Sequence, residues 1–223
     1  LTNAGILYAI HGGAANLTAK ATAGGVIELS RVANGLADNV DGVVFLGADT
    51  DAKIGRSVAG TMDVDDDGIF DIFLGSDNEA WLIPGDDPKT SSGATTVVTK
   101  PQPTGGSFST LARQIGSSYA ATDFAATVFV PGNDGDVGDL TVGPAGDVNG
   151  DGVDDFVIGA PEADPGGRTD AGKVYIIYGR PAPFAEEVEL SEVGVSVPGL
   201  AIAGAEGVNG GDPGDGLGAA VGG

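Results

Sequence analysis

The stretch Asp63-Val-Asp-Asp-Asp-Gly-Ile-Phe-Asp71, followed by the apolar run Ile72-Phe-Leu-Gly75, decides the fold because it occurs twice. Its second copy reads Asp147-Val-Asn-Gly-Asp-Gly-Val-Asp-Asp155 and continues into Phe156-Val-Ile-Gly159. An acidic loop that recurs together with the same downstream apolar run is the mark of a repeat protein. Further copies of the same unit are therefore expected in the remainder of the chain.

Two more patterns each recur three times. In the first, an aromatic residue stands four residues before a glycine, at Tyr8/Gly12, Trp81/Gly85 and Tyr175/Gly179. In the second, an apolar run (Val43–Gly47, Val128–Gly132, Leu200–Gly204) leads towards a glycine that opens a small-residue stretch (Gly55, Gly138, Gly218). Short β-branched and aromatic runs between Gly, Pro, Asn and Asp predict strands. Helical character is limited to short segments near Leu29–Val32 and Thr110–Ile115.

One repeat thus contains a strand of small residues, an Asp-rich loop, an apolar strand, an aromatic strand and a fourth strand. Four strands per unit are typical of a propeller blade. We predict an all-β chain of β-propeller-type four-stranded blades, in an incomplete array of about three blades. The predicted divisions are residues 1–48 (third and fourth strands of a first blade), 49–132 (blade with the first Asp loop), 133–204 (blade with the second Asp loop) and 205–223 (start of a further blade).

Both Asp loops predict calcium binding. Calcium takes six to eight oxygen ligands, and Asp or Asn at loop positions 1, 3 and 5 converge on one point when a glycine permits a sharp turn. The carbonyl at position 7 and an Asp at position 9 complete each set. The predicted ligands of about two sites are Asp63, Asp65, Asp67, Ile69 (carbonyl) and Asp71, and Asp147, Asn149, Asp151, Val153 (carbonyl) and Asp155.

Two other interpretations of these loops were weighed. An EF-hand needs a bidentate Glu at position 12 and flanking helices, but position 12 is Leu74 in one loop and Ile158 in the other. Solvated Asp-Gly turns are the plainer alternative, since Asp and Gly are common turn residues. Two loops with matching spacing favour a cation, because several ionised carboxylates in nine residues repel one another without one.

The charge and the amino-acid composition of the chain exclude or disfavour several kinds of partner and of functional site. A net charge of -22 disfavours nucleic acid and anionic membrane surfaces as partners. The chain has no cysteine, which excludes disulfides and thiolate metal sites, and one histidine, His11, which excludes most zinc sites and most hydrolytic triads. No apolar run approaches the ~20 residues that cross a bilayer, so we expect no membrane insertion. The recurrence of Tyr8, Trp81 and Tyr175 at one repeat position predicts packing and not a sugar-binding platform.

The chain resembles the FG-GAP repeats of integrin alpha-subunit propellers and of bacterial secreted proteins. The resemblance rests on Ile54-Gly55 to Val58, the Asp loops, Phe156-Val-Ile-Gly-Ala-Pro161 and Gly172–Gly179. It departs from the family at Gly75-Ser-Asp77, where Gly-Ala-Pro is usual, and in the long stretch 86–127. A linker between third and fourth strands, containing Val188-Glu-Leu-Ser191, is echoed by Val26-Ile-Glu-Leu-Ser30.

This resemblance implies a calcium-stabilised β-propeller, extracellular or at the cell surface, that serves adhesion or protein interaction. Its partners would be calcium and other protein chains, including copies of itself. The alternative is an accessory or catalytic part of a secreted hydrolase, but no catalytic residue or organic cofactor site is predicted. An open array also leaves unpaired strand edges, which we expect to be covered by further sequence or by strand addition from neighbouring copies.

Overall fold

The computed structural model describes residues 2–10, 12–32, 40–47, 51–85, 95–98, 126–134, 137–208 and 214–222, with only the backbone described for Leu46 and for residues 95–98. The chain divides into two compact units, which are described separately. The first contains residues 1–54 and 87–124, and the second contains residues 55–86 and 125–223. Among the described residues, no helix has the length and apolar character needed to cross a membrane.

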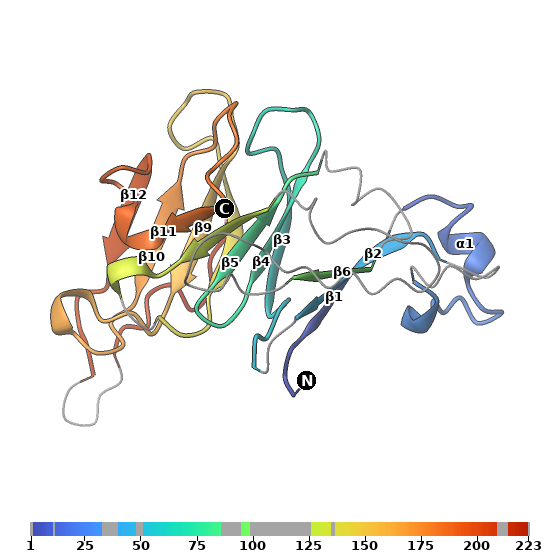
Figure 1. Ribbon diagram of the computed structural model, residues 1–223, viewed down its shortest axis with the longest axis horizontal. Helices are drawn as coiled ribbons and strands as arrows, with labels where there is room; N and C mark the ends of the chain where they lie inside the picture. The colour runs from blue at the N-terminus through green and yellow to red at the C-terminus, as the bar shows by residue number, and fades with distance from the viewer. Residues whose placement is uncertain are drawn as a thin grey trace. The chain divides into compact units, whose positions relative to one another are not determined.

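The first unit contains a three-stranded sheet of order β1-β2-β6 (Figure 1). Strand β1 (Ile6–Ile10) is antiparallel to β2 (Gly42–Gly47), with Tyr8 opposite Val44, and β6 (Thr95–Val98) is parallel to β2. Between β1 and β2 the chain forms one turn of α-helix, α1 (Leu17–Lys20), and the 3-10 helix η1 (Leu29–Arg31). The small core of this unit consists of Val32, Val40 and Val44, against which Tyr8 and Ile27 pack.

The second unit contains two sheets. The five-stranded sheet has the order β11-β7-β5-β4-β3 and the four-stranded sheet the order β12-β10-β9-β8 (Figure 1). The strands of the first sheet are β3 (Ser57–Met62), β4 (Asp71–Gly75), β5 (Ala80–Ile83), β7 (Thr127–Val130) and β11 (Glu187–Glu189). Those of the second are β8 (Thr141–Gly146), β9 (Asp155–Ala160), β10 (Lys173–Ile177) and β12 (Gly199–Ala203). Short 3-10 helices are η2 (Gly132–Asp134), η3 (Pro165–Gly167) and η4 (Leu190–Glu192).

The prediction of an all-β chain built from four-stranded blades is confirmed. Strands β3, β4, β5 and β7 form one antiparallel blade in sequence order, and β8, β9, β10 and β12 form the next. The fifth strand of the larger sheet was not predicted. It is β11, a segment from the following repeat that pairs in parallel with β7. The helix expected near Leu29–Val32 is the 3-10 helix η1, and that expected at Thr110–Ile115 lies outside the described residues.

Four phenylalanines join the two sheets of the second unit. Phe73, Phe129 and Phe156 are fully buried, and Phe184 packs on them from the connection between β10 and β12. Their rings meet edge to face at centroid separations from 4.8 to 5.9 Å. This arrangement adds about 0.5–1.5 kcal/mol per pair to the stabilisation from burial alone. Trp81 and Tyr175 are 1% and 0% exposed, so the prediction that they serve packing is confirmed.

Replacing Phe156 by Ala should destabilise the second unit by about 3–5 kcal/mol, because the change empties the centre of this ring cluster. Phe70→Ala is the matched control, since Phe70 is 63% exposed and its loss should cost less than about 0.5 kcal/mol. Denaturant unfolding of both variants gives the comparison. Equal costs for the two variants would show that the ring cluster does not hold the sheets together.

Candidate metal centre

The two Asp loops occupy the same place in successive sheets. The first joins β3 to β4, and the second joins β8 to β9, so each lies in the turn between the first two strands of its blade. The opening Asp of each loop caps the turn. Asp63 accepts hydrogen bonds from the N–H groups of Asp67 (3.0 Å) and Gly68 (2.8 Å). Asp147 accepts the equivalent bonds from Asp151 (3.0 Å) and Gly152 (2.9 Å).

The residues at loop positions 5 and 6 sharpen the turn in the same way in both loops. Asp67 accepts the N–H of Ile69 at 2.7 Å, and Asp151 accepts the N–H of Val153 at 2.9 Å. Gly68 has φ +86° and Gly152 has φ +92°, a region that residues with a Cβ adopt only at a cost. The glycine that sequence reasoning assigned to the turn is therefore required by the backbone.

The closing Asp of each loop is buried and clamps the loop to the end of the third strand. Asp71, 1% exposed, accepts the N–H groups of Val64 (2.9 Å) and Gly85 (2.9 Å). Asp155, 0% exposed, accepts those of Val148 (2.8 Å) and Gly179 (2.9 Å). Each closing carboxylate thus fixes both the start of its own loop and the backbone that follows the aromatic strand.

The glycines after the aromatic strands are explained by this clamp. A Cβ on Gly85 would lie 2.3 Å from the carbonyl oxygen of Phe70, and one on Gly179 would lie 2.2 Å from that of Asp154. Both separations are shorter than any side chain tolerates, so only glycine brings its N–H to the buried carboxylate. At Trp81/Gly85 and Tyr175/Gly179, the recurring spacing of aromatic and glycine therefore serves the Asp loop.

Three carboxylates of the first loop converge. Oxygen atoms of Asp63, Asp65 and Asp71 all lie within 4.8 Å of one another. Oxygens that share one calcium ion at 2.3–2.6 Å stand up to about 5 Å apart, so the donor type and the spacing fit such an ion. The group does not include Asp67, whose carboxylate accepts the N–H of Ile69. The ligand role of every predicted residue stays a prediction.

The second loop has the same framework with one carboxylate fewer. By position, Asp147, Asn149 and Asp155 correspond to Asp63, Asp65 and Asp71. The side-chain amide of Asn149 donates a hydrogen bond to Asp151 at 2.9 Å, and its oxygen accepts the N–H of Asp151 at 2.8 Å. The asparagine therefore organises the loop by hydrogen bonds where the first loop places a third charge.

The comparison with known families agrees with this geometry. The family model described as FG-GAP repeat matches residues 140–177, which span β8, the second Asp loop, β9 and β10. This segment of the chain is similar to an FG-GAP repeat. None of the curated proteins matches the sequence. An FG-GAP repeat suggests a protein-interaction module, and the resemblance to FG-GAP repeats stated from the sequence is confirmed, while calcium binding and the bacterial secreted type stay predictions.

Hydrogen bonds also join the first Asp loop to the neighbouring blade, a link that sequence reasoning missed. The N–H of Asp63 donates to the carboxylate of Asp154 at 3.1 Å. The N–H of Arg180 donates to the carbonyl of Val64 at 2.8 Å. One bond thus links the two Asp loops, and the other links the first loop to the segment after β10. No sequence signal reports this link, because Asp154 is an additional acid with no place in the ligand pattern.

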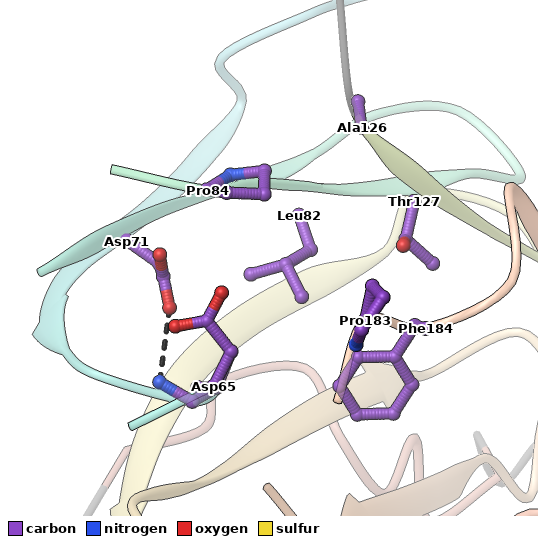
Figure 2. Close-up of a pocket in the computed structure, with 9 residues that line it drawn as sticks. Asp65, Asp71, Leu82, Pro84, Ala126, Thr127, Pro183 and Phe184 are labelled. Carbon is purple, nitrogen blue, oxygen red and sulfur yellow. Dashed lines mark hydrogen bonds between the residues drawn. The ribbon is translucent and has the colours of Figure 1, made fainter. Parts of the chain in front are cut away.

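A small pocket opens beside the converging carboxylates of the first loop. Its volume is about 90 Å³, and Figure 2 shows Asp65 and Asp71 on one side of it and Leu82, Pro84 and Phe184 around the rest. At the edge of the pocket, the Asp71 carboxylate accepts the N–H of Val64. The pocket has room for water molecules, which calcium commonly keeps among its ligands.

The electrostatic state of Asp71 reflects this crowding. Burial, assisted by the carboxylates of Asp65 and Asp67, raises the pKa of the Asp71 carboxyl to about 6. The N–H groups of Val64 and Gly85 act in the opposite direction. A divalent cation among these oxygens would favour the ionised form and so offset the burial. The single histidine, His11, lies outside the described residues.

Without a cation, the stability of the fold should fall as Asp71 ionises. Its pKa is 3.8 in a model peptide and about 6 in the fold, so the folded chain holds this proton more tightly than the unfolded chain. The resulting stabilisation is fully present below about pH 3.8 and is lost as the pH rises through about 6, in total on the order of 3 kcal/mol. Denaturant unfolding in excess chelator across this range measures the loss.

Two variants distinguish the effect of Asp71 on the pH dependence of unfolding from that of the other acidic residues. Asp71→Asn should flatten the pH dependence of unfolding in this range, whatever its effect on absolute stability. Asp66→Asn removes an exposed carboxylate of the same loop and should keep the wild-type slope. An Asp71→Asn slope equal to that of the wild type would contradict the assignment.

Proposed function

We propose that this chain is a calcium-stabilised module for adhesion or protein interaction, extracellular or at the cell surface, with no catalytic activity of its own. The observation that carries the proposal is the convergence of Asp63, Asp65 and Asp71 within 4.8 Å in a loop that the FG-GAP repeat helps to hold. The oxygen-only donors suit a hard cation such as calcium. The net charge of -22 favours cations over polyanions as partners.

The proposed ion acts on folding through the loop framework. Asp63 opens the loop and Asp71 closes it, so an ion held by both ties the end of β3 to the start of β4. Because the N–H of Gly85 binds Asp71, the same ion orders the segment after β5. Relief of repulsion among three carboxylates gives binding energy that is available only in the folded loop. A rigid edge of this kind suits a surface that other proteins contact.

Removal of calcium should lower the melting temperature. An ion at a hundredfold excess over its Kd stabilises a folded site by about 2.7 kcal/mol, which corresponds to about 5–10 °C for a chain of this size. Thermal melts in millimolar calcium and in excess chelator give the comparison. Asp63→Asn should reduce the response, whereas Asp66→Asn, outside the predicted ligand set, should keep it. Identical wild-type melts in the two conditions would reject the calcium role.

The two loops should differ in affinity because they differ in charge. The first presents Asp65 where the second presents Asn149, and one additional carboxylate at contact distance strengthens binding by about 1–4 kcal/mol, at least about fivefold. Calorimetric titration should show weaker binding to the first loop in Asp65→Asn and stronger binding to the second in Asn149→Asp. An affinity order that both exchanges leave unchanged would reject charge as the controlling factor.

A further inference from the structure

The blades are joined by a strand addition that occurs twice in the structure. Strand β6 lies in the connection from β5 to β7 and pairs in parallel with β2, the fourth strand of the preceding repeat. Strand β11 lies in the connection from β10 to β12 and pairs in parallel with β7, again the fourth strand of the preceding repeat. The connection between third and fourth strands therefore extends the sheet of the repeat before it.

The remaining fourth strand, β12, lacks such a partner among the described residues. It pairs with β10 alone and forms the edge of its sheet. Trp81 pairs with Val128 and Tyr175 pairs with Ala201, so Ala201 occupies the position of Val128. The N–H of Val128 donates to the carbonyl of Glu186 at 2.9 Å, in the chain leading into β11. The equivalent backbone N–H on β12 is that of Ala201.

The backbone of β12 presents this group outward. The carbonyl of Pro198 accepts the N–H of Tyr178 (3.1 Å), and the N–H of Gly204 donates to the carbonyl of Gly172 (2.8 Å). Both residues therefore form hydrogen bonds on the β10 side. Because hydrogen-bonding direction alternates along an antiparallel strand, Ala201 and its alternate neighbours Gly199 and Ala203 direct their N–H and C=O groups away from β10. These are the groups with which a parallel strand would pair.

The side chains of β12 are exposed although their equivalents are buried. Leu200 is 51% exposed and Ile202 is 48% exposed, whereas Phe129, which matches Ile202, is 0% exposed. The strand Gly199–Ala203 contains no charge and no proline. Charges, prolines and covering segments are the usual protection of a sheet edge, so this edge has the composition of an internal strand.

A matching donor segment lies in the first unit, in the connection between β1 and β2. Residues 27–32 read Ile-Glu-Leu-Ser-Arg-Val, and residues 188–193 read Val-Glu-Leu-Ser-Glu-Val. Each sequence ends in a 3-10 helix, η1 and η4 respectively. The residues before these helices have the same extended backbone, with φ -84° and ψ 121° at Glu28 and φ -78° and ψ 124° at Glu189. Residues 26–28 are thus the counterpart of β11.

This donor segment has an extended backbone at Glu28 and belongs to no sheet of the described chain. Val26 is 57% exposed, and its N–H and C=O bond to Thr22 at 3.3 and 2.9 Å. Those bonds hold the segment in place. They engage the backbone of Val26, the residue that matches Glu187. Ile27 matches Val188, whose backbone faces β7. Donor and acceptor halves of the repeated interaction are therefore both present, and they lie on different units of the chain.

We propose that residues Val26–Glu28 of one copy add in parallel to the outer edge of β12 of a second copy. The register copied from β11 on β7 pairs Val26 with Ala201, Ile27 with Ile202 and Glu28 with Ala203. The contact is heterologous, so repetition produces a closed ring or a fibre. The proposal rests on the function proposed above as an interaction module and names its partner, a second copy of the chain.

Cysteine cross-linking tests the pairing, because the chain has no cysteine of its own. Chains carrying Val26→Cys are mixed with chains carrying Ala201→Cys in millimolar calcium and treated with a short bismaleimide. Cross-linked dimers should form. The matched control replaces Ala201→Cys by Val58→Cys, at a residue that is 49% exposed on β3, and should give only background product. Equal products from both mixtures, or none from either, would overturn the register.

Sedimentation velocity of the wild-type chain over a range of concentrations provides the second test. Assemblies larger than one chain should form and should be lost in Ala201→Pro, which removes the outward N–H at an edge position that tolerates proline. A monomer at every concentration, or assembly that persists in Ala201→Pro, would overturn the proposal. Melting the same samples with and without calcium keeps the two proposals distinct, since a monomer that responds to calcium contradicts only the assembly.

Discussion

The buried carboxylate at position 9 of each Asp loop is the interaction on which the blades depend. Asp71 and Asp155 accept N–H groups both from the start of their loop and from the glycine after the third strand. One side chain thus fixes three strands of a blade at one edge. A buried carboxylate without such partners would cost several kcal/mol, so the hydrogen bonds and the local fold require each other.

The hydrogen bonds that bury Asp71 also hold it close to other carboxylates, and a cation would relieve the resulting repulsion. Asp71 is held beside Asp63 and Asp65, and burial with like charge raises the pKa of its carboxyl to about 6. The second loop contains one carboxylate fewer and uses hydrogen bonds of Asn149 instead. The two loops have the same backbone framework but differ by one carboxylate. The framework of the loop therefore does not depend on that charge, whereas the predicted ion binding does.

A second principle links successive repeats, because two of the three described sheets include a strand from the connection of the next repeat. Strand β11 buries Val188 beside β7, and the ring cluster containing Phe184 closes the same interface. The borrowed strand covers an edge that would otherwise invite association. Where this cover is lacking among the described residues, at β12, the chain retains an apolar strand. The strand addition proposed at β12 follows the same geometry that joins β11 to β7.

The sequence by itself determined the all-β class, the four-stranded unit, the positions of both Asp loops and the packing role of Trp81 and Tyr175. These follow from local periodicity, turn chemistry and repetition, which act over a few residues. Only the tertiary structure decided that Asp63, Asp65 and Asp71 converge, that Asp154 supports the first loop, and that β11 joins the sheet of another repeat. Such contacts connect residues far apart in the chain, and their partners are selected by the packing of whole sheets. The echo between residues 27–32 and 188–193 was visible beforehand, but its meaning depended on the strand pairing that β11 revealed.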